Sequence, residues 1–118
     1  MELELEVIQK NAVTFIKVAG AIKEVDVYRF SRSIREIIKS NPGNIAVDVT
    51  GIVFLESHAL GILVSHFTAL QRQGRELLLI NNDLSPNGYM KQLLEKTRLH
   101  EMIRVVSLET SPVQSNSV

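Results

Sequence analysis

The chain has 118 residues, enough for one domain, and its 45% hydrophobic and 22% charged residues are ordinary for a globular protein. Thirteen Lys and Arg against thirteen Asp and Glu leave no net charge, which argues against a nucleic-acid partner. The absence of cysteine excludes disulfides, thiolate metal sites and thiol catalysis, and no apolar run approaches the roughly 20 residues that span a membrane.

Two strands are predicted at the start of the chain. In residues 3–9 (LELEVIQ) apolar and polar residues alternate, which is the period of a half-buried strand. Asn11 indicates a turn, and residues 12–20 (AVTFIKVAG) repeat the alternation, so the two strands should form a hairpin. Because the opening MELELEVIQK is acidic and unlike a signal peptide, we expect a cytoplasmic protein.

After Val25 the apolar residues recur every three or four positions, which predicts a helix. Residues 41–44 (NPGN) end this helix, since proline and glycine are poor in a helix interior. Residues 45–55 (IAVDVTGIVFL) then predict a strand, and their nearly unbroken apolar run indicates cover on both faces. The predicted apolar stripe of the helix comprises Val27, Phe30, Ile34, Ile37 and Ile38.

The second half of the chain continues the alternation of helices and strands. A helix runs from Ser57 to near Gly74, and residues 76–81 (ELLLIN) predict a buried strand. Ser85 before Pro86 opens a further helix within residues 84–99, and residues 102–106 (MIRVV) predict a last short strand or helical turn. The order β-β-α-β-α-β-α predicts an α/β domain over residues 1–107, with a mixed sheet, right-handed crossovers and helices on at least one face. Residues 108–118 lack periodicity and are predicted to form a mobile tail.

Nucleophilic catalysis by Ser57 is disfavoured by its surroundings. His58 is adjacent, but neighbouring residues at a helix start project about 100° apart, which does not favour a serine–histidine hydrogen bond. Leu55 and Ala59 stand where the nucleophile elbow G-x-S-x-G has glycines. We therefore do not expect an enzyme.

Metal and cofactor sites are also not predicted. His58 and His66 are eight residues apart, about two helical turns, which is too far for one ion without other ligands. The six glycines form no phosphate-binding loop. These patterns favour a binding module that has no metal and no cofactor.

Ser57 itself has two interpretations that the residues leave open. A serine at a helix start caps the helix by accepting a hydrogen bond from a free amide, worth about 1 kcal/mol. The same free amides and the positive end of the helix dipole also tolerate a phosphate, which would add about −1.5 to −2 charges beside Glu56. Considered from these local interactions alone, the capping interpretation of Ser57 is favoured over the phosphorylated one.

The segment Glu56-Ser57-His58-Ala59-Leu60-Gly61 resembles the Asp-Ser-Ser/Thr-Gly-Leu-Gly motif of the STAS domain, and in particular of bacterial anti-sigma-factor antagonists. Residues 45–57 look like the third strand and loop of that family, residues 70–81 like its helix-to-strand junction, and residues 93–103 like its C-terminal helix. The resemblance implies a mixed sheet of four to five strands with helices mainly on one face. The chain departs from the family in three places: Glu56 replaces an aspartate, Ala59 replaces a glycine, and Gly20-Ala21-Ile22-Lys23 stands where the family has Gly-Glu-Leu/Ile-Asp.

The resemblance implies a function in partner switching. The unmodified antagonist binds an anti-sigma factor that is also a serine kinase, phosphorylation of the motif serine releases it, and a PP2C-type phosphatase resets it. Ser57 is then the phosphorylation site, and the protein is a monomer or a weak dimer. The implied partner-binding residues are Ile22, Lys23, Glu24, Glu56, His58, Ala59, Leu60, Gly61 and Val64.

A second function remains open within the same family. STAS domains also serve as constitutive adaptor subunits of lipid-transport ABC complexes or as other scaffolds. The altered segment at Lys23 and the pair His58-Ala59 favour this alternative.

Overall fold

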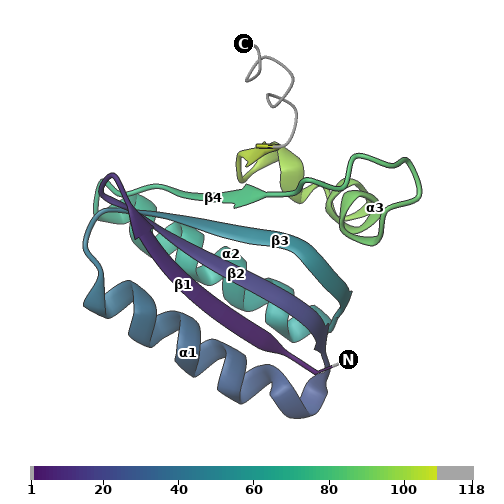
Figure 1. Cartoon of the computed structure of the whole chain (residues 1–118), viewed down its shortest axis with the longest axis horizontal. Helices are drawn as coiled ribbons and strands as arrows, with labels where there is room; N and C mark the ends of the chain where they lie inside the picture. Colours follow the sequence, from purple (N-terminus) through teal and green to yellow (C-terminus); the bar gives the residue numbers. More distant parts are fainter. Residues whose placement is uncertain (1, 109–118) are drawn as a thin grey trace.

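The computed structural model describes residues 2–108, which form a five-stranded mixed sheet with helices packed on one face (Figure 1). The strands are β1 (Glu4–Lys10), β2 (Val13–Ile22), β3 (Asn44–Leu55), β4 (Leu77–Ile80) and β5 (Val105–Val106). The helices are α1 (Val27–Ser40), α2 (Ser57–Arg72) and α3 (Tyr89–Lys96), with short 3-10 turns η1 (Glu24–Asp26) and η2 (Leu99–Glu101).

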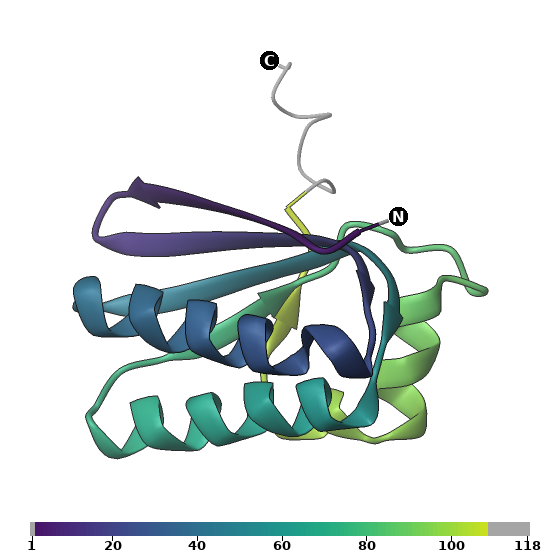
Figure 2. The same cartoon turned by 90° about the horizontal axis from the view of Figure 1, so that it is seen from below.

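The strands lie side by side in chain order, from β1 to β5. β1 pairs antiparallel with β2, and every later pair is parallel. Because parallel neighbours are joined through helices by right-handed crossovers, these helices fall on the same face of the sheet. Figure 2 shows α1 and α2 side by side beneath the sheet. The predicted hairpin and mixed α/β sheet are confirmed.

The core lies between the sheet and the helix layer. Along β2, alternate residues point inward, and Ile16 and Val18 are completely buried while Lys17 is exposed. Phe30 and Ile34 of α1 are buried as the predicted stripe requires. Burial of each large side chain stabilises the fold by about 1.5–3 kcal/mol. The largest fully buried side chains include Ile22, Ile45, Leu63, Leu70, Leu77, Leu79 and Ile103.

The expectation that β3 is covered on both faces is wrong at its carboxyl end. Val53 and Phe54 are 52% and 45% exposed. β4 pairs with β3 only from Ile45 to Asp48, so the last part of β3 extends beyond its neighbour. Among the strands, only β2 pairs with this end of β3, and the apolar side chains of Val53 and Phe54 remain partly in solvent.

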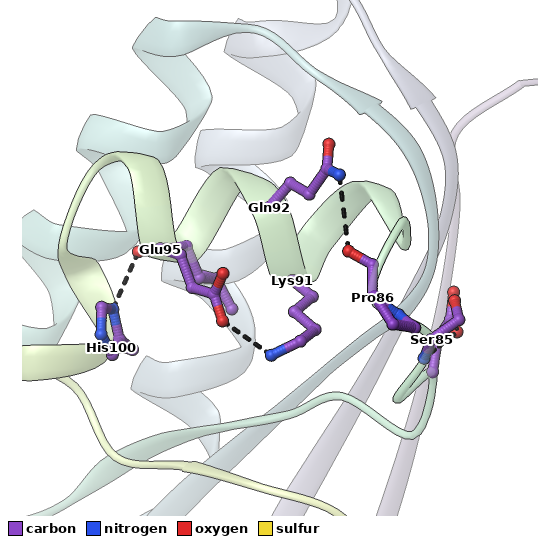
Figure 3. Close-up of polar contacts among 8 residues, drawn as sticks. Ser85, Pro86, Lys91, Gln92, Glu95 and His100 are labelled. Carbon is purple, nitrogen blue, oxygen red and sulfur yellow. Dashed lines mark hydrogen bonds and ion pairs between the residues drawn. The ribbon is translucent and has the colours of Figure 1, made fainter.

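The predicted helix start at Ser85 and Pro86 is also wrong. The Asp83 carboxylate accepts hydrogen bonds from the amide and the hydroxyl of Ser85, at 3.1 and 2.7 Å, which holds these residues in a turn. The Gly88 amide donates to the Ser85 carbonyl, and α3 begins only at Tyr89. Figure 3 shows the side-chain amide of Gln92, in α3, donating a hydrogen bond to the Pro86 carbonyl.

The end of the described chain contains both a 3-10 turn and a short strand. η2 precedes residues 102–106, and within them β5 extends the sheet beside β4. The predicted mobile tail lies outside the described residues, apart from Leu108. Across residues 2–108, no helix combines the length and the apolar character that crossing a membrane requires.

Gly20 in β2 is predicted to be important for the stability of the fold. Its φ is +95°, and a Cβ atom there would lie 2.1 Å from the Glu2 carbonyl oxygen. Gly20→Ala should therefore destabilise the protein by about 2–4 kcal/mol, through backbone strain and overpacking. Equilibrium unfolding in urea measures the difference.

Gly61 provides the matched control, because a Cβ atom there meets no atom within 4 Å. In the interior of α2, Gly61→Ala should stabilise the protein by about 0.5–1 kcal/mol. Equal effects of the two substitutions would contradict the close approach of residues 2 and 20.

Candidate functional site

Two loops emerge together from the carboxyl ends of β2 and β3. The parallel pairing of these strands continues to Ile22 opposite Leu55, and the Glu56 amide donates to the Ile22 carbonyl at 2.9 Å. This registry places η1 beside the first residues of α2. We call Glu24, Glu56, Ser57 and His58 the Ser57 cluster.

Glu56, and not Ser57, caps α2. Glu56 occupies the N-cap position with extended backbone angles, and its Oε1 accepts a hydrogen bond of 2.7 Å from the His58 amide. This is the bond that a capping side chain makes with the second residue of a helix. The interpretation of Ser57 as the cap is therefore wrong, because the residue before it has a carboxylate that reaches the free amide.

The Ser57 hydroxyl is consequently available at the surface. Ser57 is the first residue of α2 and is exposed. Its Oγ donates to Glu56 Oε2 over 3.4 Å, a long and weak hydrogen bond. A partner protein can reach this oxygen without unfolding the helix start.

Charged and titratable groups surround the hydroxyl. His58 Nδ1 lies 3.4 Å from Glu24 Oε1 and 3.4 Å from Glu56 Oε1. The side chains of His58 and Glu24 are each 70% exposed, whereas that of Glu56 is 19% exposed. Glu56 is thus the fixed member of the Ser57 cluster, and the side chains of Glu24 and His58 approach it from solvent.

The pKa of Glu56 lies below its ordinary value of 4.5. Desolvation raises this pKa, but the hydrogen bond from the His58 amide, the His58 ring, and hydrogen bonds with Glu24 and Ser57 together lower it by more. Because the pKa is depressed in the folded state, ionised Glu56 stabilises the fold above about pH 4.5. That stabilisation is lost as the pH falls through the folded-state pKa.

The structure narrows the set of residues expected to bind a partner. Ile22 and Ala59 are buried with no exposed surface, so their side chains cannot contact another protein. Leu60 and Val64 are half-buried against the core, as partly accessible members of α2. The members that the structure exposes or half-exposes beside Ser57 are Lys23, Glu24, Glu56, His58 and Gly61.

Exposed apolar residues flank the same loops, and sequence reasoning did not single them out. Val25, directly after Glu24, is 85% exposed. Phe54 lies near Tyr89, with ring centroids 6.5 Å apart, and the Tyr89 hydroxyl accepts a 2.8 Å hydrogen bond from the Leu55 amide. Exposed apolar surface beside polar groups is typical of a protein-binding site. The isolated apolar Val25 between Glu24 and Asp26 was the one sequence signal for this surface.

A separate cleft of about 310 Å³ lies between α3, η2 and β5. It is lined by none of the residues of the Ser57 cluster. Figure 3 shows its charged wall, where the Lys91 ammonium contacts the Glu95 carboxylate at 2.6 Å and His100 Nδ1 lies 3.1 Å from the Leu94 carbonyl. The hydrogen bond and the charge of Lys91 hold the pKa of Glu95 below its ordinary value.

One comparison with known proteins identifies a family. The family model described as the STAS domain matches residues 4–113. No curated protein matches the sequence closely.

Solved structures share the fold at low sequence identity. An anti-sigma factor antagonist from Mycobacterium paratuberculosis superposes with a TM-score of 0.75 and 17% identity, covering 89% of this chain and 86% of that chain. SpoIIAA in its unphosphorylated form superposes with a TM-score of 0.68 and 15% identity, covering 99% of this chain and 98% of that chain. Phosphorylated SpoIIAA from Bacillus superposes with a TM-score of 0.63 and 16% identity, covering 98% of this chain and 100% of that chain. At these identities the likeness establishes the fold alone.

Removal of the capping carboxylate should loosen the start of α2. Glu56→Ala is expected to lower the thermal midpoint at pH 7 by roughly 4 °C, because the His58 amide loses its acceptor. The difference from the unaltered protein should shrink as the pH falls below about 4.5, where Glu56 becomes protonated. Differential scanning calorimetry between pH 3 and pH 7, a range chosen around the ordinary carboxyl pKa, measures both effects.

Glu24→Ala is the control, since Glu24 contacts the same cluster but caps no helix. It should change the midpoint much less. A loss of the same size in both variants, or a loss that does not depend on pH, would argue against the capping role of Glu56.

Proposed function

Because the chain belongs to the STAS domain family, we propose that it is an anti-sigma-factor antagonist whose binding is switched by phosphorylation of Ser57. In this proposal the unmodified protein binds an anti-sigma factor that is also a serine kinase, and phosphorylation by that kinase ends the binding. A PP2C-type phosphatase then removes the phosphate and restores the form that binds. The protein acts in the bacterial cytoplasm by binding and not by catalysis. Its structural neighbours are themselves named anti-sigma factor antagonists.

The observation that carries the proposal is the division of roles between Glu56 and Ser57. Glu56 caps the helix, so a phosphoryl group transferred from ATP can replace the hydroxyl proton of Ser57 without loss of the cap. The positive end of the α2 dipole favours an added anion at this position, so phosphorylation need not unfold the domain. The modification therefore acts mainly on the surface that a partner meets.

Electrostatics explain how a phosphate would end the interaction. Phosphorylation adds about −1.5 to −2 charges at the point where two carboxylates already lie. A partner that covers Ser57 and the exposed apolar Val25 would have to bury this charge without a counterion, which is strongly unfavourable. Two of the departures from the family motif do not obstruct contact, since Ala59 faces the core and Glu56 preserves the acidic charge.

Phosphorylation should occur on Ser57 and nowhere else on α2. Incubation of the protein with its cognate kinase and ATP is expected to add one phosphate, which peptide mass spectrometry should locate on Ser57. Ser57→Ala should abolish the labelling. Ser65→Ala alters another exposed serine of α2 and should leave the labelling intact. Phosphate mapped to another residue, or efficient labelling of Ser57→Ala, would overturn the assignment.

The alternative function, a constitutive adaptor in a lipid-transport ABC complex or scaffold, is favoured by the exposed cation of Lys23 and by His58. A charge at residue 57 distinguishes the two functions. Ser57→Asp should weaken binding to an anti-sigma kinase at least about tenfold, as expected for an unpaired charge in an interface. Surface plasmon resonance with the purified kinase measures this loss.

An adaptor would instead capture transporter subunits with Ser57→Ala and Ser57→Asp equally well. That outcome, together with no measurable binding of a kinase, would overturn the proposed antagonist function in favour of the adaptor function.

A further inference from the structure

The Ser57 cluster contains three metal-ligating side chains contributed by two loops. Glu24 comes from η1, and Glu56 and His58 come from the start of α2. One ligand atom from each lies within 4.8 Å of the other two. The spacing of the histidines did not indicate this group, because its third member is 32 residues earlier in the chain and is brought close only by the pairing of β2 with β3.

The two distances from His58 match those between ligands of a tetrahedral ion. Two ligands at about 2.1 Å from a tetrahedral zinc ion are about 3.4 Å apart. His58 Nδ1 lies 3.4 Å from an oxygen of Glu24 and 3.4 Å from an oxygen of Glu56. Charge-assisted hydrogen bonds are shorter, at about 2.7–2.9 Å. The imidazole therefore lies at the distance from each carboxylate that a shared tetrahedral ion requires.

One ligand of the group is already held in place. Glu56 Oε1 accepts the His58 amide at 2.7 Å, which fixes the carboxylate and leaves this oxygen a second lone pair. The other two side chains are exposed and can adjust to an ion. Two carboxylates and one imidazole form a ligand set suited to zinc, with a fourth position for solvent.

We propose that Glu24, Glu56 and His58 bind one zinc ion at the surface beside Ser57. The ion neutralises the two carboxylates and joins η1 to the start of α2. The STAS motif has Ser or Thr where this chain has His58, so the site depends on a residue that departs from that motif. A further consequence rests on the proposed function: zinc holds Glu56 and covers one side of Ser57, so it slows phosphorylation by the kinase.

Zinc binding can be measured without any partner protein. Isothermal titration of the full chain, without an affinity tag, with zinc chloride should show one ion per chain. His58→Asn and Glu24→Gln should each weaken the affinity by roughly tenfold or more. His100→Asn removes a histidine outside the group and should leave the affinity unchanged. Both altered ligand residues are exposed, and unchanged circular dichroism of the metal-free variants would verify that they fold.

A second readout identifies the geometry. Cobalt(II) in place of zinc should give the intense visible absorption of a tetrahedral site in the unaltered protein and not in His58→Asn. The absence of saturable zinc binding, or binding that persists unchanged in His58→Asn, would overturn the site. If zinc binds but the rate of Ser57 phosphorylation does not change, only the regulatory consequence is wrong. If zinc binds and Ser57 is not phosphorylated at all, the result counts against the proposed function and not against the zinc site.

Discussion

The hydrogen bond from the His58 amide to the Glu56 carboxylate determines what the start of α2 can do. A helix start requires acceptors for its free amides, and a serine there usually supplies one. In this protein the preceding glutamate supplies it, at 2.7 Å, and Ser57 retains only a 3.4 Å contact. The hydroxyl can then be modified or covered without loss of the helix, which separates the stability of the domain from the chemistry of its surface.

The parallel pairing of β2 and β3 provides the second half of the site. Parallel neighbours end on the same edge of a sheet, so the residues after Ile22 and after Leu55 must lie together. β3 also extends beyond β4 at this edge, which exposes Phe54 next to the polar loops. The β2–β3 pairing therefore accounts for the charged cluster, and the extension of β3 beyond β4 accounts for the apolar surface beside it.

The sequence predicted those elements whose apolar period is regular. The spacing of Phe30 and Ile34 located α1, and alternation located the hairpin, because burial on one face imposes a period that local sequence retains. It could not predict the exposure of Phe54, which depends on the length of a neighbouring strand, or the turn at Ser85, which depends on the Asp83 carboxylate. Ser57 was recognised as a surface residue of interest, but Glu24 joins it only through the fold.

The amide of His58 reports directly on the separation of roles between Glu56 and Ser57. Its hydrogen-exchange rate, measured by nuclear magnetic resonance, should be the same in the unaltered protein and in Ser57→Ala, since the amide donates to Glu56. The rate should rise in Glu56→Ala. Loss of protection in Ser57→Ala to the extent seen in Glu56→Ala would show that the serine caps the helix, and would contradict the account of a free phosphoacceptor.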